Sequence, residues 1–212
     1  MMENFQQLVR DLLSGELPGK AAQRRMIARP KIPVPETVFN SRRTPAATLI
    51  LLYPTEDQIR FILTRRSQTV DQHKGQISLP GGVQNEGEDL KATALRETWE
   101  EIGVPPDHIT ILGQLSPLQV KVSGYNIHPF VGWMDFEPMI TPSPEEVEDV
   151  FSVPLAQLLD DITVRHEDMK INRFPLAVPF FQFESAKVWG ATAMILSEFK
   201  VLIQKHYAPN WD

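Results

Sequence analysis

The sequence contains no cysteine among its 212 residues. Without thiols the chain cannot form disulfide bonds, zinc sites built on thiolates, or a cysteine nucleophile. A small domain held together by disulfides is therefore excluded. Any metal ion must bind to oxygen ligands or to histidine.

Long apolar runs are also missing. The first 17 residues, MMENFQQLVRDLLSGEL, are amphipathic and polar, unlike the charged start and apolar stretch of a secretion signal. No run approaches the roughly 20 apolar residues that a membrane-spanning helix needs. We therefore expect no membrane partner and a cytoplasmic location.

Positive charge is in short supply, because 21 Lys and Arg residues stand against 27 Asp and Glu, giving a formal net charge of -6. Proteins that bind nucleic acids without sequence preference need clustered basic residues, so we expect no nucleic-acid partner. The hydrophobic content of 42% is ordinary for a soluble globular chain. It suits one domain with short flanking additions.

Several familiar catalytic motifs are absent. The chain has no G-x-S-x-G and no G-x-G-x-x-G, which removes serine hydrolases of that type and Rossmann dinucleotide sites. The segment GELPGK at residues 15–20 imitates a phosphate-binding loop but has one residue too few between its glycines. No histidine has the H-E-x-x-H or a paired metal spacing. We interpret His108, His128, His166 and His206 as surface or structural residues, and His73 is the exception worth testing.

Helical and strand patterns alternate along the chain. Apolar residues at helical spacing predict helices at residues 3–14, 88–102 and about 190–205. Short apolar runs predict strands at 46–53, 59–64, 109–115, 125–134 and 175–183, the first two as a hairpin, and a strand running into a short helix at 150–159. This alternation favours a mixed β-sheet sandwiched between helices.

The domain boundary is placed at residue 46. Residues 18–45 hold five prolines and seven Lys or Arg residues, which suits an extended connector better than any regular element. We therefore expect residues 1–45 to be an N-terminal helix and an extended linker packed on the domain of residues 46–212.

One constellation points to chemistry. Gly82 is followed after five residues by Glu88 and, after seven more, by the run RETWEEIGV at residues 96–104. At about 100° per residue, Glu97, Glu100 and Glu101 fall within an arc of roughly 100° on one helix face. Carboxylates this close repel one another, and a hard divalent cation such as Mg²⁺ or Mn²⁺ relieves that repulsion. A solvated acidic helix face is the alternative interpretation of an E-x-x-E-E string taken alone.

This constellation resembles the Nudix box, and matching its seven fixed positions at one start has a chance of about 10⁻⁸. The resemblance implies an α/β Nudix fold, with a mixed β-sheet sandwiched between helices, and a Mg²⁺-dependent hydrolase of phosphoanhydride bonds. It implies metal ligands in Glu100, Glu101 and the backbone carbonyl of Gly81. It also implies that Glu97 is a further ligand or a base, held in place by Arg96.

A second pattern lies upstream. The run ILTRRS at residues 62–67, followed by Gly75 and by LPGG at 79–82, is similar in spacing to the extra motif of the coenzyme A pyrophosphatase branch of the family. This resemblance implies cleavage of coenzyme A or its derivatives to 3',5'-ADP and 4'-phosphopantetheine. The substrate is expected to be bound by residues of this pattern and its surroundings, namely Arg65, Arg66, Ser67, His73, Gly75 and Gly82.

The sequence departs from these patterns at three positions. Asp71 replaces an arginine of the coenzyme A motif, which would weaken binding of a substrate with several phosphates. Leu79 replaces its phenylalanine, and Thr98 stands where the Nudix box usually has an aliphatic residue, on the core side of the helix. Because of Asp71, another nucleoside diphosphate derivative, such as ADP-ribose, NADH or a dinucleotide, remains an alternative substrate. A non-catalytic module that senses a nucleotide is a further alternative, against which the complete set of acids argues.

Three further acids lie downstream, where the family often supplies one more carboxylate from a loop: Glu145, Glu146 and Glu148. Glu146 best fits the E-V-x-x-V-F-x-V-P-L pattern of the branch and is the candidate base. An acidic cluster at a helix start is the alternative for each of them singly. The expected partner is a small-molecule nucleotide diphosphate, and family habit adds a homodimer.

Overall fold

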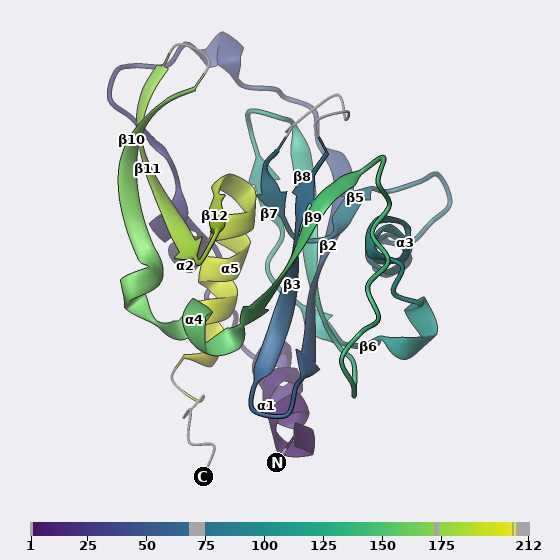
Figure 1. The fold of residues 1–212 in the computed structure, drawn as a ribbon. Helices are drawn as coiled ribbons and strands as arrows, with labels where there is room; N and C mark the ends of the chain where they lie inside the picture. Colours follow the sequence, from purple (N-terminus) through teal and green to yellow (C-terminus); the bar gives the residue numbers. More distant parts are fainter. Residues whose placement is uncertain (1, 68–74, 172–173, 205, 207–212) are drawn as a thin grey trace.

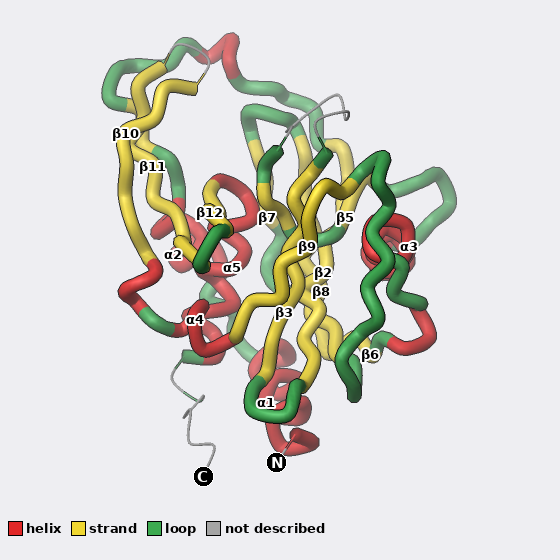
Figure 2. The backbone as a smooth tube through the Cα atoms, in the orientation of Figure 1, coloured by secondary structure: helices red, strands yellow, loops and turns green. Residues whose placement is uncertain are grey.

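The computed structural model of the protein describes residues 2–67, 75–171, 174–204 and 206. Its strands form two sheets, one of eight strands and one of four, with helices packed against them (Figure 1, Figure 2). Helix α3 (Leu90–Ile102) covers one face of the larger sheet, and α5 (Gly190–Ile203) lies between its other face and the smaller sheet. The predicted mixed sheet between helices is therefore confirmed, and the second sheet is an addition to it.

The larger sheet is mixed because one of its strand pairs is parallel. Its main path runs β4-β3-β2-β8-β6, and β2 (Thr44–Pro54) pairs in parallel with β8 (Tyr125–Trp133). The predicted hairpin is present as β2 and β3 (Ile59–Arg66), which are antiparallel. The sheet is completed by β4 (Ile77–Ser78), β5 (Gly81–Val83), β6 (Thr110–Gln114), β7 (Leu118–Val120) and β9 (Val147–Pro154).

Alternate side chains of β3 enter two different cores, as the period of two in a strand requires. Phe61 and Leu63 pack on the side of α5, while Ile62 packs on the opposite side with Ala94 and Ile102 of α3. The sheet thus separates a larger core from a smaller one beneath α3. Residues of β3 with even numbers face the helix that carries the predicted carboxylates.

Helix α3 begins two residues later than the predicted range of 88–102. The backbone of Asp89 is extended, and its carboxylate accepts a hydrogen bond from the N–H of Ala92 at 2.7 Å, which caps the helix. Gly103 ends the helix in the left-handed region, with φ 73°. Glu88 therefore stands just before the helix rather than on it.

The N-terminal segment is partly regular. Helix α1 (Met2–Ser14) confirms the predicted first helix, and its Phe5 and Val9 are buried in the core that contains α5. The expectation that residues 18–45 hold no regular element was wrong, because Ala22 and Met26 are buried and fix short elements here. These are α2 (Gly19–Gln23), the 3-10 turns η1 (Arg24–Met26) and η2 (Glu36–Val38), and β1 (Arg29–Pro30).

The smaller sheet is built mostly from the last third of the chain. Strand β11 (Phe174–Phe183) matches the predicted late strand and pairs with β1, β10 (Val164–Ile171) and β12 (Ala186–Trp189). The patterns do not predict β10, because its sequence VRHEDMKI contains no apolar run.

Short helical elements lie between several of the longer ones. Helix α4 (Leu155–Leu159) follows β9 directly, so the predicted strand running into a short helix is confirmed. The 3-10 turns η3 (Pro106–His108) and η4 (Asp161–Thr163) precede β6 and β10.

Within the described residues, no helix has the length and apolar character needed to cross a membrane.

Candidate active site

Three glutamates of α3 project from the side of the helix that is not embedded in the core. The side chain of Glu101 is 2% exposed, that of Glu97 is 14% exposed and that of Glu100 is 46% exposed. On the opposite side of the helix, Thr98 and Ile102 are fully buried. Thr98 donates its hydroxyl to the Ala94 carbonyl at 2.7 Å, so this departure from the aliphatic pattern is satisfied inside the helix.

Arg96 holds three carboxylates at once. Its Nη1 lies 2.8 Å from Glu97 Oε1 and 2.6 Å from Glu100 Oε2, and its Nε lies 2.9 Å from Glu88 Oε1. The hydrogen bond from Arg96, with a smaller contribution from Thr93, lowers the pKa of Glu88 to about 2. Glu88 is therefore an anionic anchor for Arg96, a role that the spacing of the motif alone does not disclose.

Two glycines bring the backbone of β5 against these acids. A Cβ atom on Gly82 would lie 2.4 Å from the Cδ of Glu97, so this carboxylate can keep its position only while residue 82 is glycine. Gly81 has φ 154°, and a Cβ atom there would lie 2.3 Å from the carbonyl oxygen of Ala47. Its backbone N–H donates a hydrogen bond to the carboxylate of Glu101.

Glu101 is the most deeply buried of the three acids. Arg66 Nη1 lies 3.6 Å from its Oε1, and Thr64 Oγ1 lies 3.5 Å from its Oε2. Burial raises the pKa of Glu101 to about 8, because Arg66 only partly offsets the loss of hydration and the charges of Glu97 and Glu146 add to it.

Glu97 is the second acid of α3 whose pKa is raised. Burial raises the pKa of Glu97, its pairing with Arg96 opposes the rise, and the charges of Glu100 and Glu146 add to it. Because the charge of Glu146 contributes to the raised pKa of both Glu97 and Glu101, we infer that the three carboxylates lie near one another. Such a group favours binding of a cation.

Glu146 lies in the loop just before β9 and is the fourth acid near this group. Its side chain is half-buried, whereas Glu145 and Glu148 are exposed. The backbone N–H of Ser67, at the end of β3, donates to the carbonyl oxygen of Glu146 at 2.8 Å. Of the three downstream acids, the structure thus brings Glu146 to the acids of α3.

The other predicted substrate residues are placed differently. Arg65 lies on the face of β3 away from α3, where its Nε is 3.2 Å from Asp149 Oδ2 and its guanidinium lies over the ring of Phe151. Gly75 has φ 67° and donates its N–H to the Arg66 carbonyl at 3.0 Å, so it supports the strand end that carries Arg66. His73 and Asp71 lie outside the described residues.

The donor set fits a hard divalent cation, since Glu97, Glu100 and Glu101 offer carboxylate oxygens above a glycine that leaves space for them. In the parts of the chain that are described, no three acidic or histidine side chains are arranged to hold a metal ion as they stand. Glu97 and Glu100 are instead paired with Arg96, whose Nη1 lies 2.8 and 2.6 Å from their carboxylate oxygens. Binding of a cation would require these carboxylates to rearrange.

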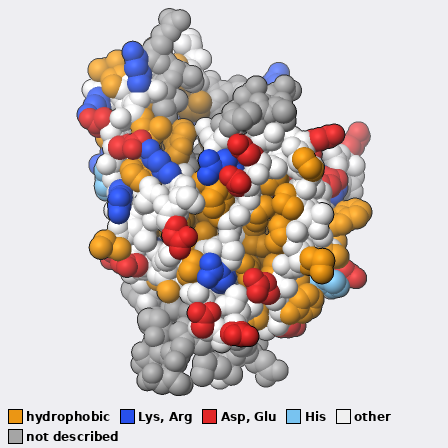
Figure 3. Space-filling view, in the orientation of Figure 1, with side chains coloured by type: hydrophobic (Ala, Val, Ile, Leu, Met, Phe, Trp, Pro, Cys, Tyr) orange, Lys and Arg blue, Asp and Glu red, His pale blue; other side chains and the backbone are white. Residues whose placement is uncertain are grey.

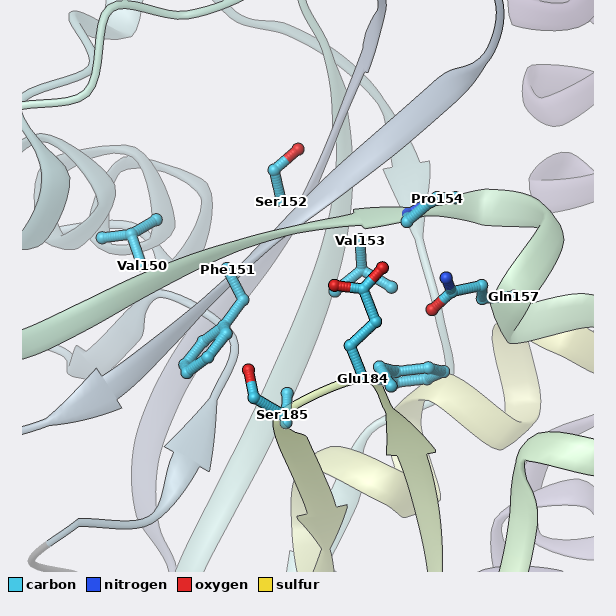
Figure 4. Close-up of a pocket in the computed structure, with 10 residues that line it drawn as sticks. Val150, Phe151, Ser152, Val153, Pro154, Gln157, Glu184 and Ser185 are labelled. Atoms are coloured by element: carbon cyan, nitrogen blue, oxygen red, sulfur yellow. The ribbon is translucent and has the colours of Figure 1, made fainter.

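Two hollows lie apart from the carboxylates. One, of about 200 Å³, lies between the edge strand β9 and the turn joining β11 to β12, where Phe151, Gln157 and Glu184 line it (Figure 4). The other, of about 330 Å³, lies at the end of α3 beside the exposed Phe136 and Met139. On the face drawn in Figure 3, acidic and basic side chains are interspersed and hydrophobic ones gather toward the side that carries α3.

Comparisons with known proteins place this arrangement in a family. A family model described as the NUDIX domain matches residues 42–172. The uncharacterized Nudix hydrolase NudL of Photorhabdus laumondii subsp. laumondii is 32% identical over 173 residues, which cover 81% of this chain and 91% of that protein. Nudix hydrolase 22, chloroplastic, of Arabidopsis thaliana is 37% identical over 161 residues, covering 71% of this chain and 52% of that protein.

A solved structure agrees on the fold. The Nudix hydrolase RenU of M. smegmatis has a TM-score of 0.52 and 16% identity, over 78% of this chain and 89% of that chain. The chain therefore belongs to the Nudix family. It is a Nudix hydrolase, an enzyme that acts on phosphoanhydride bonds.

Proposed function

We propose that this enzyme hydrolyses the diphosphate of coenzyme A or its derivatives, releasing 3',5'-ADP and 4'-phosphopantetheine. Mg²⁺, with Mn²⁺ as an alternative, would be held by Glu97, Glu100, Glu101 and the backbone carbonyl of Gly81. The observation that carries it is the buried carboxylate of Glu101, which Arg66 of the upstream motif contacts directly at 3.6 Å. One contact thus joins the residue of the Nudix box to the residue of the substrate motif.

The cation would supply positive charge against the diphosphate and make water in the site more acidic. The acids of α3 are suited to hold it because Glu88, rather than Glu97 or Glu100, forms the most strongly stabilised contact with Arg96. Arg96 can therefore stay anchored by Glu88 while Glu97 and Glu100 turn to other partners. We assign Arg96 the role of orienting Glu97.

Glu146 is the proposed general base. Its charge contributes to the raised pKa of Glu97 and of Glu101, which supports a position close enough to accept the proton of the water that attacks phosphorus. Arg66, whose side chain is 29% exposed, can turn from Glu101 to an oxygen of the diphosphate. Gly82 leaves the backbone of β5 open to the same space.

The upstream motif supports the choice of coenzyme A. Thr64 and Arg66 of this motif contact Glu101, and Gly75 donates its N–H to the Arg66 carbonyl, which supports a role of the motif at the site. Leu79 is 2% exposed and belongs to the larger core, so its replacement of a phenylalanine changes packing rather than a ligand contact. The other proposed substrate residues are Ser67, His73 and Arg65. Because Arg65 points to the opposite face of β3, it would contact only a part of the substrate that extends beyond the edge of the sheet.

Competing substrates are ADP-ribose, NADH and dinucleotides, because Asp71 replaces the motif's arginine. A module that binds a nucleotide without cleaving it is the competing class.

We further propose a cytoplasmic homodimer, with residues 1–45 as an N-terminal extension of the domain formed by residues 46–212.

The test is Mg²⁺-dependent hydrolysis of a panel that contains coenzyme A, acyl coenzyme A, NADH, ADP-ribose and diadenosine polyphosphates, with products identified by chromatography. Preferential release of 3',5'-ADP from coenzyme A is the expected result. Preferential cleavage of another member would reject coenzyme A as the substrate and retain the hydrolase. Binding of a nucleotide with no cleavage of any member would reject hydrolysis.

A further inference from the structure

The loop at residues 141–147 is attached to the end of the helix that carries the acids. The last carbonyl groups of a helix lack partners within the helix and must find them elsewhere. Here the N–H of Thr141 donates to the Ile102 carbonyl at 2.9 Å, and the N–H of Ser143 donates to the Glu101 carbonyl at 3.0 Å. The loop thus binds the backbone of the same residue whose side chain lies in the active site.

The same loop is closed on itself and on β3. The N–H groups of Glu146 and Val147 donate to the Ser143 carbonyl at 3.1 and 2.8 Å, and the carbonyl of Glu146 accepts from Ser67 at 2.8 Å. Arg66, next to Ser67, contacts the side chain of Glu101. The contacts therefore form a ring that runs from the Glu101 backbone through Ser143, Glu146, Ser67 and the adjacent Arg66 back to the Glu101 carboxylate.

Two features make this loop stiff. Ser143 lies between Pro142 and Pro144, whose rings fix their φ angles and restrict the residues before them. Thr141 also packs directly on Gly103, where a Cβ atom would lie 2.9 Å from the Thr141 Cβ and 3.0 Å from its carbonyl oxygen. The helix end and the loop consequently fit together only if residue 103 is glycine.

We propose that residues 141–147 are a positioning loop, in which the contacts of Gly103 and Ser143 fix the carboxylate of Glu146 relative to Glu97 and Glu101. This inference rests on the proposed function, because it assumes that Glu146 is the base. Gly103 and Ser143 are positioning residues that act through Glu146. They need not touch the substrate.

The first test substitutes Gly103→Ala, with Gly190→Ala as the matched control. Both glycines have left-handed φ, 73° and 68°, but a Cβ atom on Gly190 has no atom within 4 Å, so the control carries the strain without the collision. Gly103→Ala is expected to lower kcat by about 100-fold, as a displacement of the base of about 1 Å would, with KM changed less than about twofold. Gly190→Ala is expected to keep kcat within about twofold of wild type. A Gly103→Ala enzyme with wild-type kcat would overturn the proposal.

The second test separates positioning from general damage. In a Glu146→Gln background, Gly103→Ala should lower kcat by less than about twofold further, because residues acting as a unit are not additive. A further loss as large as in the wild-type background would mean that Gly103 acts only on the structure, and the proposal fails. If Glu146→Gln keeps wild-type activity, Glu146 is not the base and the positioning proposal fails, while the hydrolase activity stands. If the wild-type enzyme itself has no activity, the proposed function is rejected.

A third pair of variants avoids the glycine in case Gly103→Ala does not fold. Ser143→Pro removes the N–H that binds the Glu101 carbonyl, while Ser143→Ala keeps it. We expect Ser143→Pro to lower kcat at least about tenfold and Ser143→Ala to leave it within about twofold. Equal kcat values for the two variants would contradict the role of this hydrogen bond.

Discussion

At the scale of single residues, Glu101 combines almost complete burial with a group that is ordinarily ionised at neutral pH. Its contacts with Arg66, Thr64 and the Gly81 N–H offset only part of the cost of removing the carboxylate from water. The pKa of Glu101 rises to about 8 as a result. Acids held in this way are typical of sites that bind cations or transfer protons.

A pH dependence of stability follows from this pKa. Between the ordinary value of 4.5 and about 8, the folded protein binds more protons than the unfolded chain, so the free energy of unfolding falls as pH rises through this window. Glu101→Gln removes this effect. In buffer with a chelator, thermal unfolding should show a variant that is more stable than wild type at pH 9, with a difference that shrinks toward pH 5. If the difference in stability between Glu101→Gln and wild type is the same at pH 5 and at pH 9, Glu101 is not a buried group that ionises in this range.

Gly82→Ala tests the close approach of β5 to the acids. The added Cβ would lie 2.4 Å from the Glu97 Cδ and must displace that carboxylate, so kcat should fall about 100-fold. Gly15→Ala is the control, because its Cβ would make only ordinary contacts at 3.6 and 3.7 Å. Steady-state kinetics of both variants measure the effect, and equal activity of Gly82→Ala and wild type would place the reaction elsewhere.

Residue-scale prediction from the sequence succeeded where spacing on a helix decides and was less complete on the strand. The 3.6-residue period correctly separated Glu97 and Glu101 from the core side of α3, where Thr98 is buried. Arg65 and Arg66 were both expected at the substrate, yet neighbours on a strand point to opposite faces, and only Arg66 contacts Glu101. Strand alternation applied to β3 would have separated them.

At the scale of elements, α3 was predictable because both of its ends carry local signals. Asp89 caps the start and Gly103 ends the helix, and both are recognisable in the sequence. The attachment of residues 141–147 to its end could not be predicted, since it joins backbone groups about forty residues apart that have no side-chain pattern. Strand β10 escaped prediction for a related reason, because pairing with β11 rather than its own composition makes it a strand.

Helix α1 offers a prediction at this scale. Phe5 is 9% exposed and its ring lies 5.9 Å from that of Trp133, so α1 covers the core at one end of β8. Phe5→Ala should lower the free energy of unfolding by about 3 kcal/mol. Asn4→Ala, at an exposed position of the same helix, should change it by less than about 0.5 kcal/mol. Chemical denaturation compares the two, and equal stabilities would mean that α1 contributes little to the core.

At the scale of the whole molecule, a buried carboxylate joins distant parts of the chain. Glu198 of α5 is fully buried and accepts hydrogen bonds from the N–H groups of Gly19 and Ser116 at 3.1 and 3.2 Å and from Gln23 Nε2 at 2.8 Å. The C-terminal helix, the segment after β6 and the N-terminal segment thereby meet at one side chain. The two contacts with Gly19 and Gln23 attach both ends of α2 to α5.

Glu198→Gln tests this junction. The amide cannot accept with its nitrogen, so one donor loses its partner and the free energy of unfolding should fall by about 1–3 kcal/mol. The exposed Glu36→Gln should have almost no effect. Activity per folded molecule should stay at the wild-type level in both, and a selective loss of activity in Glu198→Gln without loss of stability would contradict a purely structural junction.

We propose that the carboxylates of α3 carry out the hydrolysis of the phosphoanhydride bond. The most direct measurement compares Mg²⁺-dependent turnover of wild type and Glu101→Gln on the preferred substrate of the panel, with circular dichroism to show that both are folded. Loss of one acid from such a cluster should lower kcat by about a thousandfold or more at unchanged fold. A folded Glu101→Gln enzyme with full activity would contradict the claim.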